Sequence, residues 1–380
     1  MNKPLYDIVL PGRFIDRPNR FIVHAKVQGQ VAICHMPNPG RMRELLFPGC
    51  QLYVTPSHSP QAKTAYRVIG VEKAGTIFFL DTSRCNDVAA YLVQAKQIPG
   101  WEDYVLLRRE VTMGDSRFDL LLGNPETGEV FPVEVKSCSL SGREGAMFPD
   151  APTERGYKHL RHLANIGKEG GHAGLLILVH DENARWFLPD FHTDPDFAQA
   201  FYDGISEVDW KVAVISWTPE FTMPDTCRLI PTSRTALEEE IGDRGNYLLV
   251  LQLPEDRDIE SRGQPIHLPA GYYIYIGSAT EQLRKHCRRY RNVRKKKADT
   301  LDTLRAYCHW IGVLPICAKE ELALLAAQGL TDIADWVITD IAGLPGQQRL
   351  FGFHQNPMYS KAFTLLEEEL MINRLGIYFK

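Results

Sequence analysis

The first 83 residues alternate short apolar runs with turn signals. Runs such as "RFIVHAKV" and "QLYVTPS" are rich in β-branched and aromatic residues, and "DRPN", "NPG" and "FPG" separate them. Short, closely spaced strands punctuated by proline and glycine are typical of small barrels and sandwiches. The pattern predicts about five strands and favours a small β-barrel such as the OB-fold, with a β-sandwich as the alternative.

The period of the pattern lengthens in the middle of the chain. Residues 86–98 and 153–167 have apolar side chains at helical spacing, and they alternate with strand-like runs such as 173–180 and 210–217. This alternation predicts an α/β domain with a mixed sheet.

A polar stretch at 233–245 separates this domain from a third unit. Strand-like runs at 246–253 and 271–279 are followed by a helical pattern at 319–330, which predicts α+β structure. We therefore predict a multidomain α+β and α/β protein with three domains, at residues 1–83, 84–235 and 242–380.

The composition is that of a globular protein, with 44% hydrophobic and 24% charged residues among 380. No apolar run reaches the roughly 18 residues of a membrane-spanning helix, and the first residues lack the apolar stretch of a signal peptide. The eight cysteines include no Cys-x-x-Cys pair. These features predict a cytoplasmic protein with reduced thiols and no membrane partner, and they leave the oligomeric state open.

Charged residues interrupt two strand-like runs between residues 116 and 140. Asp119 lies in the first run, and Glu134 and Lys136 lie in the second. Pro125 and Gly128 between the runs suit early and late positions of a turn. A hairpin symmetric about this turn pairs positions whose numbers sum to 253, so Asp119 faces Glu134 and Lys136 shares their face.

Two carboxylates about 5 Å apart repel each other unless a cation intervenes. Mg²⁺ (or Mn²⁺) suits such a pair, because a hard ion binds one or two carboxylates together with waters. The bound ion acidifies water and stabilises charge at a phosphate, and a lysine adds to this stabilisation. The hairpin therefore predicts a metal-dependent hydrolytic site, with a salt-bridged network on a solvent-exposed face as the alternative.

The sequence of Asp119 and then Glu134-Val135-Lys136 resembles the core motif of the PD-(D/E)XK nuclease superfamily. More closely, residues 1–235 resemble the sugar fermentation stimulation protein (SfsA) family, through "GRFIDRPNRF", "CHMPNPGRMRELLFPG" and "FPDAPTERGYKHLRHL". The resemblance implies an OB-like N-terminal domain that binds DNA and a PD-(D/E)XK-like mixed-sheet nuclease domain. It also implies that Asp119 and Glu134 bind the metal and that Lys136 is catalytic.

Residues after the hairpin extend the candidate site. In the predicted helix, Glu154 and Lys158 share one stripe, and Arg155 and His159 share the next. We predict Lys158, in preference to His159, as a further catalytic residue, and Arg155 as a DNA contact. Glu110 is an additional candidate carboxylate.

Arginines of the N-terminal domain gather around proline and glycine turns, and arginine binds phosphate in a bidentate manner. We predict DNA contacts at Arg13, Arg20 and Arg41. Phe21 is either a stacking platform for bases or a core residue, and its position before an alternating run favours the core.

The third unit resembles GIY-YIG nucleases, and most closely their diverged relatives of unknown function. Gly245-Asn246-Tyr247 corresponds to the first half of that motif, and Tyr275-Ile276-Gly277 to the second. In the following helix, His286 stands where the resemblance expects an arginine, and Tyr290 where it expects a histidine. These departures predict a catalytically degenerate site at Tyr247, Tyr275, Gly277 and His286.

Basic residues concentrate in one segment of the third unit. Residues 282–298 contain nine Lys or Arg and no acid, although the net charge of the chain is −4. Such a run releases counterions from a polyanion and binds nucleic acid without reading its sequence. We predict DNA contacts at Arg288, Arg289, Lys295 and Lys296, with RNA or an unpartnered surface loop as alternatives.

Together these features predict a sequence-nonspecific DNA-binding protein with a Mg²⁺-dependent PD-(D/E)XK nuclease centre that hydrolyses phosphodiester bonds. The alternative is a non-catalytic DNA-binding regulator of sugar-utilisation genes, in which the charges of the hairpin are structural.

Overall fold

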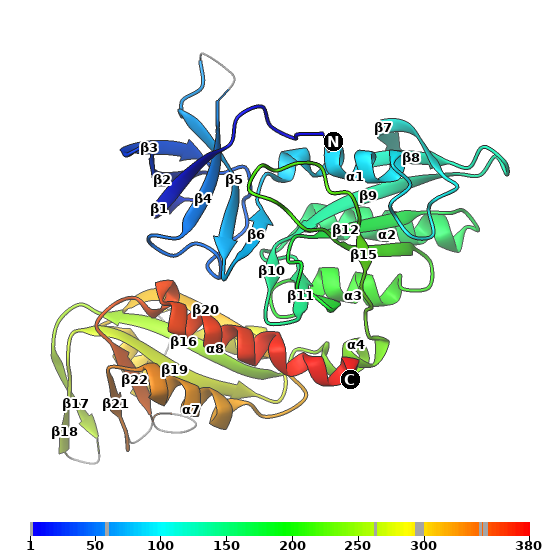
Figure 1. The fold of residues 1–380 in the computed structure, drawn as a ribbon. Helices are drawn as coiled ribbons and strands as arrows, with labels where there is room; N and C mark the ends of the chain where they lie inside the picture. Colours follow the sequence, from blue (N-terminus) through cyan, green and yellow to red (C-terminus); the bar gives the residue numbers. More distant parts are fainter. Residues whose placement is uncertain (1–2, 58–60, 262–263, 293–299, 342–343, 345–348) are drawn as a thin grey trace. The chain divides into compact units, whose positions relative to one another are not determined.

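The computed structural model describes residues 3–57, 61–261, 264–292, 300–341, 344 and 349–380. The chain forms two compact units, residues 1–234 with 375–380, and residues 235–374 (Figure 1). Each unit has its own sheets and its own apolar core.

The first unit begins with a closed five-stranded β-barrel. Its strands are β1 (Leu10–Asn19), β2 (Ile22–Val27), β3 (Gln30–His35), β4 (Gln51–Pro56) and β5 (Tyr66–Lys73). The order is β3-β2-β1-β4-β5, and a parallel pairing of β3 with β5 closes the barrel, while β6 (Thr76–Phe79) extends from β5. The predicted barrel is confirmed, and the β-sandwich is wrong.

A six-stranded mixed sheet follows, in the order β15-β14-β12-β9-β8-β7. Its strands are β7 (Val105–Met113), β8 (Ser116–Gly123), β9 (Val130–Cys138), β12 (Gly174–Val179), β14 (Asp209–Val214) and β15 (Arg228–Leu229). β9, β12 and β14 run parallel, whereas β7, β8 and β15 pair antiparallel with their neighbours. The predicted mixed sheet is confirmed.

Helices cover both faces of this sheet. Val88 and Leu92 of α1 (Cys85–Gln94) share a core with Val133 and Val135 of β9. Successive side chains of a strand point to opposite faces, so Glu134 points away from α1. It contacts α2 (Glu154–Lys168), which packs against α3 (Pro195–Asp203). The remaining elements are η1 (Thr82–Arg84) and a small sheet of β10 (Leu140–Ser141), β11 (Gly145–Phe148) and β13 (Trp186–Pro189).

The barrel and the mixed-sheet domain share one apolar core. Phe79 of β6 stacks on Trp217 with ring centroids 4.5 Å apart, and Tyr53 of β4 lies 5.4 Å from Phe221. Because these aromatic pairs join the two domains, residues 1–234 behave as one compact unit.

A neutral histidine lies in this shared core. His180 is fully buried; Trp217 Nε1 donates a hydrogen bond to its Nδ1 at 3.2 Å, and its Nε2 lies 2.9 Å from Ser137 Oγ. Burial lowers the pKa of His180 to about 3, so the ring has no charge at pH 7.

Arg41 joins the barrel to the mixed-sheet domain. Its Nε donates to the backbone oxygen of Asp150 at 2.6 Å, and its Nη2 donates to Thr193 Oγ1 at 2.5 Å. The neighbouring Gly40 lies against the buried Asp150 carboxylate, where a Cβ on Gly40 would be 2.1 Å from Asp150 Oδ2. The structure thus places Arg41 at the domain junction with its side chain exposed, and its predicted DNA contact stays a prediction.

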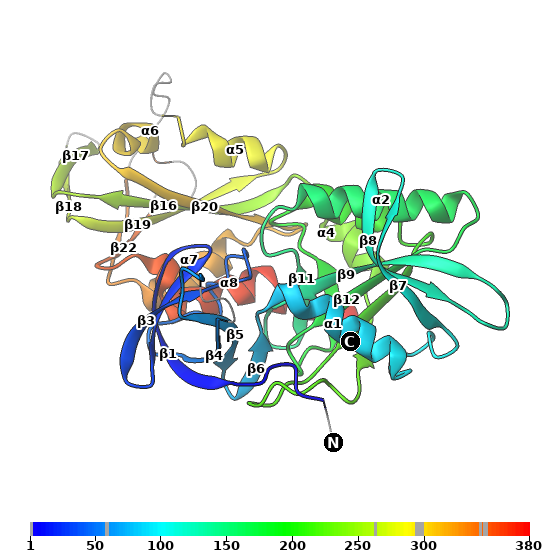
Figure 2. The same cartoon turned by 90° about the horizontal axis from the view of Figure 1, so that it is seen from above.

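The second unit is an α+β domain, as predicted. Its antiparallel sheet has the order β20-β16-β19-β22-β21, with strands β16 (Gly245–Leu253), β19 (Gly271–Ala279), β20 (His309–Cys317), β21 (Trp336–Ile338) and β22 (Leu350–Phe353). α7 (Ala323–Ile333) and α8 (Lys361–Met371) cover one face, and α5 (Leu283–Arg289) and α6 (Thr300–Arg305) lie on the other (Figure 2). The other elements are α4 (Arg234–Glu240), the paired strands β17 (Arg257–Ser261) and β18 (Gln264–Leu268), and η2 (Pro357–Tyr359). The last element, η3 (Asn373–Phe379), begins in the second unit and ends in the first.

Two further features concern the environment of the chain. All eight cysteines lie in the described residues as free thiols. Within the described ranges, no helix is long and apolar enough to cross a membrane.

We expect His180 to make the stability of the first unit depend on pH. Because its folded pKa of about 3 lies below the ordinary value of 6.5, the unfolded chain takes up the proton first. Its contribution is complete above about pH 6.5 and falls by up to about 1.4 kcal/mol per pH unit as the pH drops towards 3. Urea denaturation between pH 7 and 4 should show a shallower pH dependence in His180→Gln than in wild type; equal slopes would contradict this.

The junction gives a second prediction. Arg41→Ala removes two hydrogen bonds across the domain junction and should lower the free energy of unfolding by about 1 kcal/mol. Arg20→Ala is the matched control, because the Arg20 side chain is also exposed but makes no hydrogen bond or ion pair among the described residues, and it should stay within about 0.5 kcal/mol of wild type. Urea denaturation midpoints measure both, and identical midpoints for the two variants would refute the role of Arg41.

Candidate functional site

The hairpin of β8 and β9 has the register predicted from the sequence. Its pairs sum to 253, namely Leu120–Val133, Leu121–Pro132, Leu122–Phe131 and Gly123–Val130. In the turn, Asn124 Oδ1 accepts from Glu126 N at 2.9 Å, and Gly128 has φ of +76°, a conformation that favours glycine. The paired region ends at Leu120 and Val133, so the next two residues, Asp119 and Glu134, lie where the strands separate.

Asp119 is held by two neutral donors. Asn86 Nδ2 donates to its Oδ1 at 2.7 Å, and Val135 N donates to its Oδ2 at 2.8 Å. Burial raises the pKa of Asp119, and the nearby charge of Glu134 raises it further, against the effect of these donors. The two carboxylates therefore interact, as the hairpin predicts.

Glu134 is only 3% exposed and has charged or polar partners on one oxygen. Lys136 Nζ lies 2.5 Å from Oε1, and His159 Nδ1 lies 2.6 Å from the same atom. Burial alone would raise the pKa of Glu134, but the His159 and Lys136 contacts outweigh it, so the pKa lies below its ordinary value. The other oxygen, Oε2, is buried and has no hydrogen-bond partner.

These residues fit a hard divalent ion. Glu134 Oε2 is a buried acceptor that the protein leaves unsatisfied, and such atoms are rare in native structures. Within the described ranges, no group of three or more His, Cys, Asp or Glu side chains could hold a metal ion. Mg²⁺ needs only one or two carboxylates, since waters complete its shell. Asp119 and Glu134 are the residues that would hold it.

The helix α2 presents His159, and not Lys158, to these carboxylates. His159 is buried beside Glu134, whereas Lys158 Nζ pairs with Glu154 Oε1 at 2.9 Å on the exposed side of the helix. The predicted contact of Lys158 with the site is therefore not formed, and Glu154 also lies away from it.

The sequence contains a signal for His159 that the prediction did not use. The buried residues of α2 include Leu160, Leu163 and Ala164, and His159 precedes Leu163 by one helical turn. Extending the apolar stripe backwards would have placed His159 on the buried face. Asn86, the partner of Asp119, has no comparable signal, because it comes from a different element.

Two other predicted residues lie at the edge of the site or outside it. Arg155 is exposed, and its Nε lies 3.5 Å from His159 Nε2, so it borders the buried cluster. Glu110 instead forms an exposed ion pair with Arg117. Glu110 is therefore not a third carboxylate of this site.

Phe21 and the arginines Arg13 and Arg20 all lie on the surface of the barrel. Phe21 is 51% exposed, so its assignment to the core is wrong. Ile33 of β3 is similarly exposed, and Arg20 lies next to Phe21 on the surface. Arg13 is exposed as well and donates to Gly49 O at 3.3 Å.

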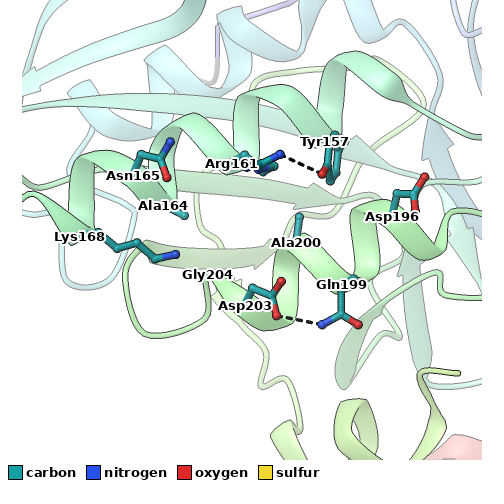
Figure 3. Close-up of a pocket in the computed structure, with 10 residues that line it drawn as sticks. All are labelled: Tyr157, Arg161, Ala164, Asn165, Lys168, Asp196, Gln199, Ala200, Asp203 and Gly204. Carbon is teal, nitrogen blue, oxygen red and sulfur yellow. Dashed lines mark hydrogen bonds between the residues drawn. The ribbon is translucent and has the colours of Figure 1, made fainter.

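A separate pocket of about 270 Å³ lies between α2 and α3 (Figure 3). Figure 3 shows Arg161 bonded to the Tyr157 hydroxyl and Gln199 bonded to Asp203 within this pocket. At 3.6 residues per turn, Tyr157 and Arg161 lie on the face of α2 opposite His159. The pocket is therefore distinct from the carboxylate site.

In the second unit, the predicted motif residues come together. The rings of Tyr247, Tyr275 and Tyr290 lie 6.2 to 6.4 Å apart, and all three are buried. Gly277 pairs with Tyr247 across the strands, and a Cβ on Gly277 would lie 2.0 Å from the Tyr247 ring. His286, one helical turn before Tyr290, lines a hollow on α5.

Two of the four basic residues predicted to contact DNA in this unit lie in the described part of the chain. Arg288 is exposed, and Arg289 Nη2 pairs with Asp302 Oδ2 at 2.9 Å. Lys295 and Lys296 lie outside the described residues.

The fold and the hairpin define the class of protein. An OB barrel precedes a mixed sheet in which Asp119 on one strand meets Glu134 and Lys136 on the next. This is an OB domain joined to a PD-(D/E)XK-like nuclease fold.

The comparisons with known proteins give the family. Residues 15–80 match the SfsA N-terminal OB domain, and residues 83–220 match the sugar fermentation stimulation protein RE domain. A sugar fermentation stimulation protein homolog from Clostridium acetobutylicum is 38% identical over 198 residues, covering 52% of this chain and 86% of the relative. One from Methanothermobacter thermautotrophicus is 37% identical over 191 residues, covering 50% and 79%. The chain belongs to the sugar fermentation stimulation protein family.

A solved structure and a third domain match complete the comparison. Pyrococcus furiosus SfsA in complex with Ca²⁺ is 25% identical, with a TM-score of 0.54 over 61% of this chain and 99% of that chain. Residues 246–341 match the domain of unknown function DUF123. The resemblance to the SfsA family is confirmed, and so is the match of the third unit to relatives of unknown function.

The geometry of α2 predicts different outcomes for two neighbouring residues. His159→Ala leaves the buried Glu134 carboxylate with one donor fewer and should lower the free energy of unfolding by about 2–4 kcal/mol. Lys158→Ala removes an exposed ion pair and should change it by less than about 0.5 kcal/mol. Urea denaturation of both variants measures the difference. A Lys158→Ala effect as large as that of His159→Ala would show that the described face of α2 is not the one that supports the site.

Proposed function

We propose that this protein is a divalent-metal-dependent DNA phosphodiesterase whose active centre is the hairpin of β8 and β9. The observation on which the proposal rests is Glu134 Oε2, a buried carboxylate oxygen with no protein partner, next to Asp119 and Lys136. The Ca²⁺ complex of the Pyrococcus furiosus relative supports a divalent ion. We propose Mg²⁺ or Mn²⁺ as the ion that acts in the reaction.

Each residue has a role that follows from its contacts. Asp119 and Glu134 hold the ion, which when bound would polarise a phosphate oxygen and acidify a water. Lys136 Nζ, already 2.5 Å from Glu134 Oε1, would stabilise the negative charge that develops on the phosphate. His159 acts as a positioning residue, because it fixes Glu134 Oε1 and leaves Oε2 directed to another partner.

The barrel would bind the DNA substrate without reading its sequence. Exposed apolar side chains, Phe21 and Ile33 among them, lie with the cations Arg13, Arg20 and Lys26 on β1, β2, β3 and their turn. Aromatic side chains beside cations are typical of single-strand binding, because bases stack while phosphates pair with the charges. We propose Arg13, Arg20 and Phe21 as DNA contacts, and Arg155 as a contact near the active centre.

The proposal keeps the three domains at residues 1–83, 84–235 and 242–380. It also keeps a cytoplasmic location, which suits eight free cysteines. Two alternatives remain for the experiment below. The substrate is RNA, or the protein regulates sugar-utilisation genes without cleaving nucleic acid.

Cleavage assays test the proposal directly. Purified protein is incubated with single-stranded, duplex and branched DNA and with single-stranded RNA, in Mg²⁺, Mn²⁺ or chelator. We expect metal-dependent cleavage of DNA, reduced at least about 100-fold in Asp119→Ala and in Lys136→Ala.

The matched control is Lys158→Ala, whose side chain lies on the exposed face of α2 and pairs with Glu154, so it should cleave at the wild-type rate. Binding in chelator should weaken in Arg20→Ala and persist in Asp119→Ala. Binding that persists on every substrate without cleavage in either metal would contradict the nuclease and favour the non-catalytic regulator.

A further inference from the structure

A basic hollow lies on α5 of the second unit. Figure 2 shows α5 on the face of the sheet opposite α7 and α8. The volume of the hollow is about 560 Å³, and its lining is Gln282, Lys285, His286, Arg288, Arg289 and Asn292. We refer to it as the α5 hollow. Its lining contains three permanent cations and a histidine but no carboxylate.

The cations of the α5 hollow are largely uncompensated. Lys285 Nζ donates to the neutral Gln282 Oε1 at 2.8 Å, so its charge remains available. Arg288 is exposed, and its side chain has no ion pair among the residues that the structure describes. Arg289 differs, because its pair with Asp302 fixes the guanidinium in place. The hollow therefore combines two available charges with one immobilised arginine.

This combination of groups suits a phosphate. Arginine offers a rigid set of donors that matches phosphate oxygens, and lysine adds a point charge. A nucleic-acid strand that places phosphates here would release counterions, which gives binding a steep dependence on salt. A hollow without a carboxylate would, by contrast, repel metal ions and cationic peptides.

The tyrosines of the neighbouring motif are sealed from solvent. Tyr247, Tyr275 and Tyr290 are 3%, 2% and 2% exposed, and Tyr290 of the same segment packs against the other two rings. Burial raises the pKa of the Tyr247 hydroxyl well above its ordinary value, so the group stays protonated. With so little of each side chain exposed, these tyrosines are core residues.

We propose that the α5 hollow binds phosphate groups of a nucleic-acid backbone, and that the second unit binds without cleaving. This site is separate from the carboxylate hairpin, and its success or failure does not depend on the nuclease proposal. The same chemistry accepts a free phosphomonoester, which the experiment distinguishes from a strand.

The test uses the full chain in chelator with a fluorescent single-stranded oligonucleotide at several salt concentrations. The double variant Lys285→Ala/Arg288→Ala should bind about tenfold more weakly and reduce the salt slope by about 1–2. Lys361→Ala on α8 is the matched control, because it removes an exposed cation from the opposite face of the sheet and should bind like wild type. The proposal is overturned if the double variant keeps the affinity and salt slope of Lys361→Ala.

Competition identifies the source of the phosphate. Part of the oligonucleotide binding is expected to be lost in the double variant. A nucleoside 5′-monophosphate that competes away this part of the binding would identify a monoester site. Displacement only by unlabelled oligonucleotide would identify backbone phosphodiesters. Inorganic phosphate serves as the third competitor at matched ionic strength, and displacement by it alone would reduce the site to a general anion site and overturn the nucleic-acid assignment.

The absence of cleavage is tested with the first site disabled. In Asp119→Ala with Mg²⁺ or Mn²⁺, the oligonucleotide should stay intact. Cleavage that survives in Asp119→Ala and disappears when Tyr247→Phe is added would show an active second unit and overturn this part of the proposal. Folding of each variant is checked by its urea denaturation midpoint.

Discussion

The contacts of Glu134 Oε1 with Lys136 and His159 keep a negative charge inside the molecule. A buried carboxylate without such donors takes up a proton instead of remaining ionised. One partner lies two residues further along β9, and the other comes from α2, so the charge is stable only when that helix packs on that strand. The helix is fixed at its start, where Thr153 caps it and Asp194 Oδ2 accepts from Thr153 N at 2.7 Å. The position of Glu134 is therefore set by interactions between three segments far apart in the sequence.

The two carboxylates differ in a way that favours a bound cation. The pKa of Glu134 is lowered by its partners, whereas the pKa of Asp119 is raised by burial and by the Glu134 charge. When both carboxylates are ionised, the protein's donors leave part of their negative charge uncompensated, because Glu134 Oε2 has no partner and the Glu134 charge raises the pKa of Asp119. A divalent ion between them would lower the pKa of Asp119 and satisfy Glu134 Oε2 together. An added cation would compensate the remaining charge, which is what the proposed metal site requires and a closed salt bridge does not.

The parts of the site predicted correctly depend on local rules, and the errors depend on tertiary packing. The hairpin register followed from its turn residues and a period of two, so Asp119, Glu134 and Lys136 could be brought together from the sequence alone. Lys158 and His159 are adjacent, and only the orientation of α2 on the sheet decides which one enters the site. Phe21 was assigned to the core because it precedes a strand with alternating apolar residues. That pattern does not show that a side chain in the turn before the strand points to solvent. The acceptors of Arg41 come from residues more than 100 positions away, and no local pattern indicates them.

Clusters of arginine look alike in a sequence, but their charges have different uses in the fold. Both Arg41 and Arg20 are exposed, but Arg41 donates to acceptors within its own unit, whereas the Arg20 side chain has no hydrogen bond or ion pair among the described residues. The same contrast separates Arg289, which is paired with Asp302, from Arg288 on the same helix. Only a cation whose donors are not taken by internal acceptors can exchange counterions for the phosphates of a polyanion. The proposed affinity for nucleic acid therefore depends on where a few exposed cations lie, and not on a net charge that is negative.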